Sequence, residues 1–342
     1  MNLFKKYLTN QGPKPYFRKK FNINKFLVIS GLKYLSFGNK NPNKIFFIIN
    51  RSPGAGLFSN LTFVLNQLKF CEENKFIPII DMENFTTIYN EKKKIDNSLN
   101  AWDYYFEKIN SHKIDDVYKS SNLIFSNSKF QKKMSIDIQD KKLNQAFSKI
   151  KIKKKFINEM NIFFKKNFLS NDRILSVHFR GSTYKTARRH AYPSTISEMI
   201  KNIDQLIKKY KYNKIFLVTE EQKYLDELKK IYDKKLIYYP SYRMTKVDSF
   251  RIYPREDHRY KLGKEAIIEM LILSKCHGIT YVKSNIVSAA KRFSKIKQHD
   301  HEIFFGYNSR NIYVARWKWY LKYYFPIIFG KIKKLSIQSF HI

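Results

Sequence analysis

The sequence predicts an α/β protein built from two Rossmann-like domains that face each other across a cleft. Short, continuous apolar runs such as KIFFIIN at 44–50 and KIFLV at 214–218 are typical of strands buried on both faces of a parallel sheet. Helical patterns follow these runs, and the alternation of strand and helix repeats from about residue 172 to 295 and less completely in the first half. At 342 residues the chain is long enough for two such domains.

The first half contains one βαβ unit. A strand is expected at 44–50, and a turn at 51–60 with Gly54 and Gly56 leads into a helix whose apolar face carries Leu61, Val64, Leu65, Leu68 and Phe70. The next strand, 77–80, completes the unit with a parallel pairing. A strand, a glycine loop and a helix in this order point backbone N–H groups at an anion. A lone G-x-G also occurs in loops that only connect two elements, so both interpretations of this turn stay open.

The second half follows a polar middle region. Residues 90–155 are rich in lysine and are expected to form helices and loops, and a further helix is expected at 158–167. The second half then gives strands at 174–177, 214–218, 236–239 and 279–282, with helices at 196–210, 224–231, 263–274 and from Asn285 through Ala290. A long polar segment, 241–261, interrupts this series. Long polar loops inside a compact domain are more often functional than idle.

An arginine follows the first strand of the second half. The strand at 174–177 runs into His178-Phe179-Arg180-Gly181. Open α/β sheets bind their ligands at the carboxyl ends of the strands. The planar guanidinium of arginine donates two hydrogen bonds to a phosphate at once. Arg180 is therefore our first candidate for a phosphate-binding residue, and the alternative is a surface turn with solvated charges.

The charge of the chain indicates an anionic partner without identifying it. The net charge is +38, from 66 Lys and Arg against 28 Asp and Glu, which suits nucleic acid, a phosphosugar or an anionic membrane. The lysines are spread over the whole chain, and no RNA-recognition motif is present, which argues against a nucleic-acid-binding protein. Hydrophobic residues make up 43% of the sequence and exclude a disordered chain.

The cysteines and the absence of targeting signals favour a reducing compartment. Cys71 and Cys276 allow one disulfide at most, and both lie in helix-like runs where packed core thiols are expected. The basic start does not match a secretory signal, and no run of 18 apolar residues predicts a membrane-spanning helix. No Cys/His spacing is typical of a zinc site, so we expect no metal. We expect a cytoplasmic bacterial protein, with contact to the inner membrane as a further hypothesis.

The C-terminal segment mixes aromatic and basic side chains. The run RWKWYLKYYFPIIFGKIKK, which begins at Arg316, suits an anionic lipid surface because its rings alternate with cations. The alternative is a helix that packs back on the first domain with its lysines in water. Both interpretations stay open.

Taken together, these motifs resemble the superfamily of fucosyltransferases that use GDP-fucose, namely the α-1,6-, protein-O- and bacterial nodulation-type enzymes. Their His-x-Arg signature stands here as His178-Phe179-Arg180. The remaining motifs follow in the same order, as Thr219-Glu220, Glu269 before Leu273-Ser274, and Ser284-Asn285. In the first half, GAGLFSN at 54–60 is similar to the glycine loop of their acceptor domain. The resemblance covers residues 44–295.

The resemblance implies a fold of the glycosyltransferase B type and an inverting sugar transfer that needs no metal or other cofactor. The donor would be GDP-fucose and the acceptor a glycan. Arg180 would stabilise the negative charge that develops on the departing GDP, Ser284 would bind the same phosphate, and Glu269 would accept from guanine N–H groups. The substrate-binding residues implied in this way are His178, Gly181, Glu269, Ser284, Asn285, Gly54, Gly56 and Asn60.

The expected domains agree with these assignments. They are a basic N-terminal extension at 1–40, an acceptor-side α/β domain at 41–155, a nucleotide-sugar-binding α/β domain at 156–310 and the basic aromatic segment at 311–342.

The sequence departs from the superfamily pattern at the position of the general base. Thr183 stands where relatives usually carry aspartate, and no carboxylate lies between Arg180 and His190. His190 is our first candidate for the base because the unperturbed pKa of histidine is near neutrality, and the alternative is a structural or substrate contact. The reserve candidates are Asp248, Asp257 and His258. A GDP-linked sugar other than fucose, or a non-catalytic relative that binds a glycan or a membrane, stays open.

Overall fold

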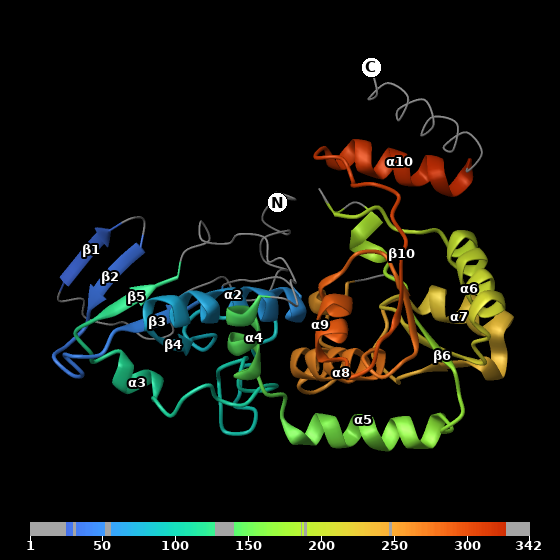
Figure 1. Ribbon diagram of the computed structural model, residues 1–342. Helices are drawn as coiled ribbons and strands as arrows, with labels where there is room; N and C mark the ends of the chain where they lie inside the picture. The colour runs from blue at the N-terminus through green and yellow to red at the C-terminus, as the bar shows by residue number, and fades with distance from the viewer. Residues whose placement is uncertain are drawn as a thin grey trace. The chain divides into compact units, whose positions relative to one another are not determined.

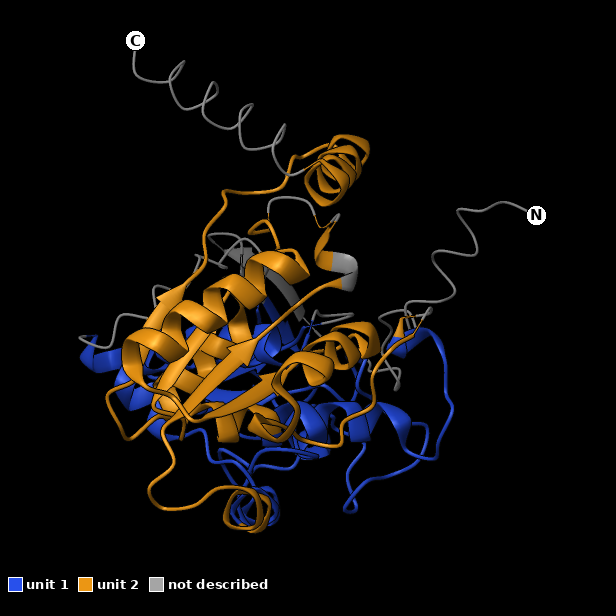
Figure 2. Ribbon diagram, turned by 90° about the vertical axis from the view of Figure 1, so that its right-hand side faces the viewer, with its two compact units in different colours: residues 1–161, 249–268 blue, residues 162–248, 269–342 orange. Residues whose placement is uncertain are grey.

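A computed structural model describes residues 25–29, 32–51, 56–126, 140–185, 187, 190–245 and 248–325. It divides the chain into two compact units, residues 1–161 with 249–268 and residues 162–248 with 269–342 (Figure 2). The chain leaves the first unit within helix α5 (Lys154–Asn167), returns at 249 and leaves it again within helix α8 (His258–Leu273). Each unit has a five-stranded sheet, which confirms the α/β prediction.

The second unit is a doubly wound parallel sheet (Figure 1). Its strands are β6 (Ile174–His178), β7 (Lys214–Val218), β8 (Leu236–Tyr238), β9 (Gly278–Tyr281) and β10 (His299–Glu302). They lie in the order β10-β9-β6-β7-β8, and every neighbouring pair is parallel. The four predicted strands are confirmed, and β10 is an edge strand that was not predicted. Figure 1 shows α6 (Ile196–Tyr210) and α7 (Gln222–Tyr232) on one face and α9 (Asn285–Phe293) on the other.

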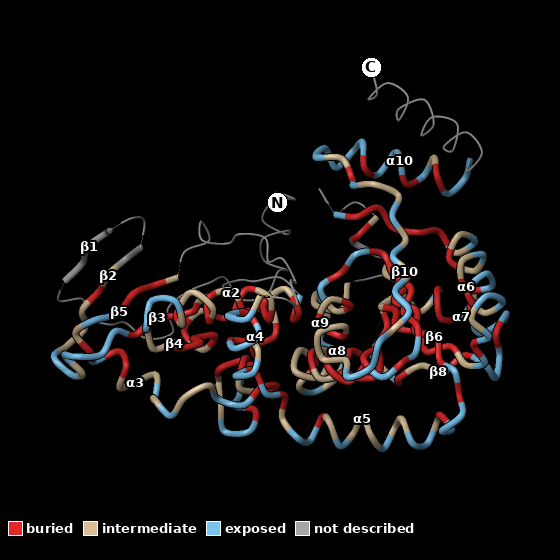
Figure 3. The backbone as a smooth tube through the Cα atoms, viewed as in Figure 1, coloured by how far each residue is buried: buried red, intermediate tan, exposed pale blue. Residues whose placement is uncertain are grey.

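This sheet forms because its central strands are apolar throughout. Every residue of β6 is buried (Figure 3), and its apolar side chains pack with those of β7, α6 and α7 in one core. That core includes Leu175, Val177, Met199, Ile203, Leu217 and Leu228. Helix α6 begins with a capping box, in which Thr195 and Glu198 bond each other's backbone N–H groups. The order of the strands reverses between β6 and β9, and doubly wound sheets bind ligands at such a switch point.

The first unit contains a mixed sheet. Its strands are β1 (Lys25–Ile29), β2 (Leu32–Ser36), β3 (Phe46–Ile49), β4 (Ile77–Ile80) and β5 (Leu123–Phe125), in the order β1-β2-β5-β3-β4. The predicted βαβ unit is confirmed, because β3 and β4 pair in parallel and α2 (Leu57–Asn74) connects them. Two short helices, α3 (Ile114–Val117) and α4 (Lys141–Ser148), complete the unit. No element was predicted before residue 44 and no strand within 90–155, whereas β1, β2 and β5 extend this sheet by antiparallel pairing of β1 with β2 and of β2 with β5.

Much of the polar segment 241–261 folds on the first unit. A short 3-10 helix, η4 (Ser249–Arg251), precedes α8, which begins at His258 rather than at the expected Gly263. Arg255 forms a double hydrogen bond with Glu265 at 2.6 and 2.9 Å. This ion pair ties the segment before α8 to the helix itself.

The last described helix is α10 (Ile312–Tyr324). It packs on the second unit, whereas one of the two open interpretations of the sequence placed it on the first domain. Lys322 is buried and donates to the carbonyl of Pro193 at 2.9 Å. Cys71 and Cys276 are buried free thiols, as expected for core residues. Among the helices of the described residues, none combines the length and the apolar character that a bilayer crossing demands.

Candidate functional site

The candidate site lies at the switch point of the second unit's sheet. Strand β6 ends at His178, and β9 is followed by Ser284, which is the N-cap of α9. The Oγ atom of Ser284 lies 3.3 Å from Nδ1 of His178, so two predicted residues meet. Burial and then the charge of Arg180 lower the pKa of His178 to about 3, which keeps the imidazole neutral at physiological pH.

The N-terminus of α9 offers hydrogen-bond donors at the same place. Ser284 makes no side-chain capping bond to the helix, and the first helical residue, Asn285, is exposed. The first N–H groups of an α-helix have no partner within the helix, and the helix dipole adds positive potential there. These features favour binding of an anion at the N-terminus of α9, where Ser284 and Asn285 lie.

Arg180 follows β6 in a turn that is fixed by its neighbours. The Phe179 N–H donates to the carbonyl of Val218, and the Phe179 ring stacks on Tyr224 with centroids 4.0 Å apart. The guanidinium carbon of Arg180 lies 3.8 Å from the centroid of the Tyr184 ring. Its Nε atom is buried and has no hydrogen bond to the described part of the chain.

One carboxylate lies close to Arg180 without neutralising it through a hydrogen bond. Oε1 of Glu220 is 3.7 Å from Nε of Arg180. The neighbouring Glu221 instead accepts from Nζ of Lys185, at 2.9 and 3.2 Å. The Tyr184 ring and the nearby Glu220 carboxylate thus orient the Arg180 guanidinium, whose Nε makes no hydrogen bond to the described residues. Sequence reasoning missed Tyr184, whose only signal was its position four residues after the arginine.

The turn is too crowded at position 181 for any residue larger than glycine. A Cβ atom at this position would lie 2.2 Å from Oε1 of Glu221 and 2.6 Å from Cε2 of Tyr224. Any larger residue would therefore displace Glu221 or the turn that carries Arg180.

His190 lies near the same turn. Its ring is 4.7 Å from the ring of Tyr184, edge to face. Burial of part of the ring, followed by the charge of Arg180, lowers the pKa of His190 below the usual 6.5. A neutral imidazole at pH 7 is able to accept a proton.

Glu269 lies at the same edge of the sheet, beside β8. It is buried and accepts a hydrogen bond from Oγ of Ser241 at 2.6 Å, and its Oε1 lies 3.8 Å from Nη2 of Arg243. The Met244 N–H donates to the carbonyl of Glu220, which ties this segment to the surroundings of Arg180. Arg243 was not predicted, although the polar segment that contains it was expected to be functional.

The remaining predicted residues, apart from Asp248, belong to the first unit. Gly54 lies outside the described residues. Gly56 is the N-cap of α2, and the buried Asn60 accepts from Nε of Arg51 at 3.3 Å. Among the reserve bases, Asp248 belongs to the second unit. Asp257 belongs to the first unit, and its Oδ1 lies 3.6 Å from Nζ of Lys93. His258, also in the first unit, is buried with Nε2 2.9 Å from the carbonyl of Ser249.

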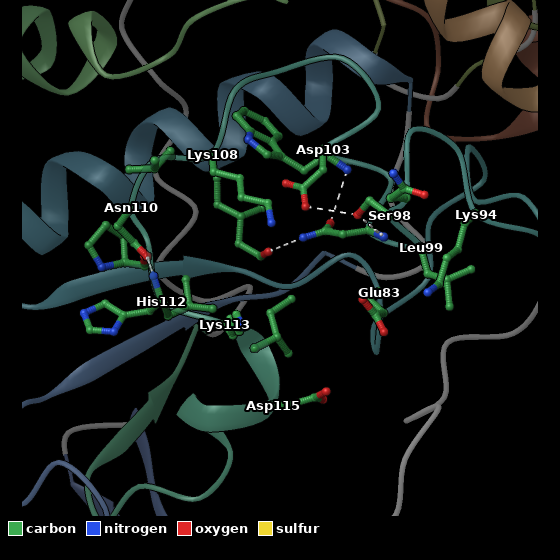
Figure 4. A pocket seen from close by; sticks show the side chains of 18 residues that line it. Glu83, Lys94, Ser98, Leu99, Asp103, Lys108, Asn110, His112, Lys113 and Asp115 are labelled. Atoms are coloured by element: carbon green, nitrogen blue, oxygen red, sulfur yellow. Dashed lines mark hydrogen bonds between the residues drawn. The ribbon is translucent and has the colours of Figure 1, made fainter.

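A pocket of about 370 Å³ lies within the first unit (Figure 4). Its polar lining includes Asn97, Ser98, Asp103, Lys108, Asn110 and His112. Ser98 donates to Asp103 at 3.0 Å, and burial raises the pKa of that carboxyl. None of the predicted site residues lines this pocket. Within the described ranges, no group of three or more His, Cys, Asp or Glu side chains is arranged to hold a metal ion.

Comparison with known proteins gives similarity in structure alone. No protein-family model and no curated protein matches the sequence. The fold matches NodZ α-1,6-fucosyltransferase co-crystallized with GDP, with a TM-score of 0.52, 14% identity, and coverage of 74% of this chain and 93% of that one. Fucosyltransferase NodZ from Bradyrhizobium matches with a TM-score of 0.50, 15% identity, and coverage of 74% and 94%. NodZ soaked with GDP-fucose matches with a TM-score of 0.50, 15% identity, and coverage of 73% and 93%.

These matches show the fold. The chain has the α/β architecture of the glycosyltransferase B type, and the fold class predicted from the sequence is confirmed.

Proposed function

We propose that this protein is a glycosyltransferase of the GDP-fucose-dependent superfamily. It transfers fucose from GDP-fucose to a hydroxyl group of a glycan. The observation that carries this proposal lies at the switch point of a parallel sheet, where His178 at the end of β6 meets Ser284 at the N-terminus of α9 and Arg180 stands two residues after β6. Support comes from the shared fold, since one of the matched NodZ structures was co-crystallized with GDP and another was soaked with GDP-fucose.

The chemistry of the leaving group explains why these residues are needed. When the bond between the sugar and the diphosphate breaks, negative charge develops on the phosphate oxygen that departs with GDP. Arg180 stabilises that charge with its fixed, positively charged donors, and the effect exceeds its contribution to ground-state binding. Ser284 and the first N–H groups of α9 bind the same phosphate.

Fixed donors of this kind supply the positive charge that a metal ion provides in other transferases. We therefore propose that the transfer is independent of a metal. The sugar is attacked from the face opposite the diphosphate, and the product has the inverted configuration at the anomeric carbon.

The remaining residues bind the nucleotide and activate the acceptor. Neutral His178 seats the nucleotide through the nitrogen that does not face Ser284. Glu269 accepts from the N–H groups of guanine, and its contacts with Ser241 and Arg243 hold the carboxylate in place. His190 takes the proton from the acceptor hydroxyl, because its lowered pKa leaves it unprotonated at pH 7. Gly54, Gly56 and Asn60 bind the acceptor.

We place this activity in the cytoplasm of a bacterium. Two buried free thiols support this, because cysteines persist in reduced form in reducing compartments.

The test is a transfer assay with GDP-fucose labelled in the sugar and a mixture of glycan acceptors. We expect release of GDP, appearance of the label in a glycan, and no change on addition of EDTA. NMR of the product gives its anomeric configuration, and GDP-mannose in parallel tests the choice of sugar. Binding of GDP-fucose without transfer to any acceptor would contradict the catalytic proposal in favour of a non-catalytic relative, and inactivation by EDTA would contradict metal independence.

A further inference from the structure

Helix α10 carries two faces of opposite character. Its inner face, formed by Ala315, Trp319 and Lys322, is at most 7% exposed. Four aromatic residues repeat at helical spacing on the opposite side and are 46–78% exposed, namely Tyr313, Trp317, Tyr320 and Tyr324. We call these four residues the aromatic stripe. The tube in Figure 3 alternates between buried and exposed along this helix.

The inner face fixes the helix to the second unit, so the stripe cannot turn inward. Nζ of Lys322 lies 2.7 Å from Oε2 of Glu198 and 3.7 Å from the centroid of the Phe305 ring. Trp319 packs against the Tyr192 ring, and the centroid of its own ring lies 5.5 Å from Nζ of Lys185. A buried charge that is paired and hydrogen-bonded in this way is costly to remove from its site. The stripe therefore stays on the outside of a firmly attached helix.

The charged residues of α10 itself are all basic. Arg316 and Lys318 are both exposed; Arg316 lies beside the stripe, and Lys318 lies between the stripe and the inner face. No Asp or Glu follows Glu302 anywhere in the sequence. Such a face repels a second copy of itself, and it is complementary to an anionic surface.

We propose that α10 is a docking helix for an anionic lipid bilayer. The helix lies parallel to the surface with the stripe in the headgroup region, and Arg316 and Lys318 contact lipid phosphates. Tyrosine and tryptophan suit this region because each ring has an apolar body and a polar edge. Tyr320 and Tyr324 are nearly parallel, with an interplanar angle of 10° and ring centroids 6.2 Å apart.

The proposal goes beyond sugar transfer and does not depend on it. It is tested with the full chain in sedimentation with vesicles. One set contains phosphatidylcholine alone, and the other contains about a third phosphatidylglycerol, whose headgroup carries the negative charge. We expect binding to the anionic vesicles and little to the neutral ones, with loss of binding at high salt.

Two pairs of variants separate the stripe from general surface effects. The stripe variant combines Tyr313→Gln, Trp317→Gln and Tyr320→Gln, and its control combines Ile162→Gln and Leu169→Gln, which are 69% and 70% exposed elsewhere on the second unit. The charge variant combines Arg316→Gln and Lys318→Gln, and its control combines the exposed Lys201→Gln and Lys208→Gln on α6. All four variants alter exposed residues, so unfolding temperature and GDP affinity should stay at the wild-type values.

The expected losses are large for the test variants. Removing two cations near the surface should weaken binding to anionic vesicles by roughly twenty-fivefold, about fivefold for each. The stripe variant should lose roughly tenfold or more, because it removes apolar area that the lipid covers. Both controls should bind as the wild type does.

Several outcomes would overturn the proposal. These are equal binding by the stripe variant, equal losses in the controls, or absence of wild-type binding to anionic vesicles. A concentration-dependent dimer that only the stripe variant abolishes would make this face an interface between copies. Loss of binding to single-stranded DNA rather than to vesicles would make it a nucleic-acid site.

Discussion

Two turns of this molecule begin in the same way and end differently. In each unit, an arginine stands two residues after a buried strand, namely Arg51 after β3 and Arg180 after β6. Arg51 donates to Oδ1 of Asn60 at 3.3 Å and to Oγ of Ser59 at 3.2 Å. Arg180 makes no hydrogen bond with the described part of the chain and lies against the face of Tyr184.

The difference arises from the element that comes after each arginine. Helix α2 starts at Leu57, so its first turns bring polar side chains within reach of Arg51. After Arg180, a short 3-10 helix, η2 (Ser182–Lys185), supplies the Tyr184 ring, which holds the cation without accepting a full hydrogen bond. An arginine whose donors are used by its own unit has a structural role. An arginine that is oriented but not satisfied is available to bind a ligand.

The largest effect should come from Arg180. We expect Arg180→Ala to lower kcat for sugar transfer by about 10²–10³, because it removes a donor that acts mainly on the charge of the transition state. Arg180→Lys keeps the charge but loses the planar pair of donors, so it should recover only part of this loss. Steady-state kinetics with GDP-fucose measure both. Equal kcat in the alanine variant and the wild type would remove the distinction between the two arginines.

The next effect should be that of His190 on the pH profile. A general base acts in its unprotonated form, and the pKa of His190 is lowered from 6.5. We therefore expect kcat/KM to stay constant down to this lowered pKa and to fall tenfold per pH unit below it. His190→Gln should lower the rate by about 10² and abolish this acidic limb. An acidic limb that persists unchanged in the variant would assign the base to another group.

The two glycines allow a matched comparison of the turns. Gly181→Ala should lower stability by about 1–3 kcal/mol and GDP affinity by roughly tenfold, because the new Cβ displaces Glu221 and the Arg180 turn. At Gly56, no atom of the described residues lies within 4 Å of the new Cβ, and its φ of −54° suits any residue, so Gly56→Ala should leave GDP affinity unchanged. Thermal unfolding and calorimetry measure both, and similar effects at the two positions would contradict this account.

The smallest effect should be that of Ser284. Ser284→Ala removes one hydroxyl from the phosphate site and its contact with His178, so GDP affinity should fall by about fivefold, as expected for one hydrogen bond. Calorimetric titration gives the value. A loss as large as that of Arg180→Ala would show that the hydroxyl, rather than the guanidinium, dominates the site.

The parts of the fold that could be predicted from the sequence are those with an apolar pattern. Strands buried on both faces, such as β3 and β7, carry continuous apolar runs, and their order gave the parallel pairing of β3 with β4. Strand β10 has the sequence HDHE and is largely exposed at the sheet edge, where backbone pairing with β9 suffices. No side-chain pattern is needed there, so none was available to predict it. The same reason explains the early start of α8, whose first turns are held by polar contacts.

The site residues that could be predicted from the sequence are those at the carboxyl ends of strands. The ends of β6 and β9 are adjacent because of the strand order, and this brings His178 to Ser284. The contacts of Glu269 with Ser241 and Arg243 depend on the path of a polar loop, for which the sequence has no periodic signal. Likewise, the sequence shows two arginines after two strands, and only the structure shows that one is satisfied by its neighbours.

The most direct test of this difference is calorimetric titration of GDP into the wild type, Arg180→Ala and Arg51→Ala, each with and without EDTA. We predict micromolar binding to the wild type that EDTA does not change and that is lost in Arg180→Ala. Arg51→Ala should bind GDP as the wild type does and should only unfold at a lower temperature. A folded Arg180→Ala variant that binds GDP normally, or an equal loss in both variants, would contradict the assignment of the phosphate site to Arg180.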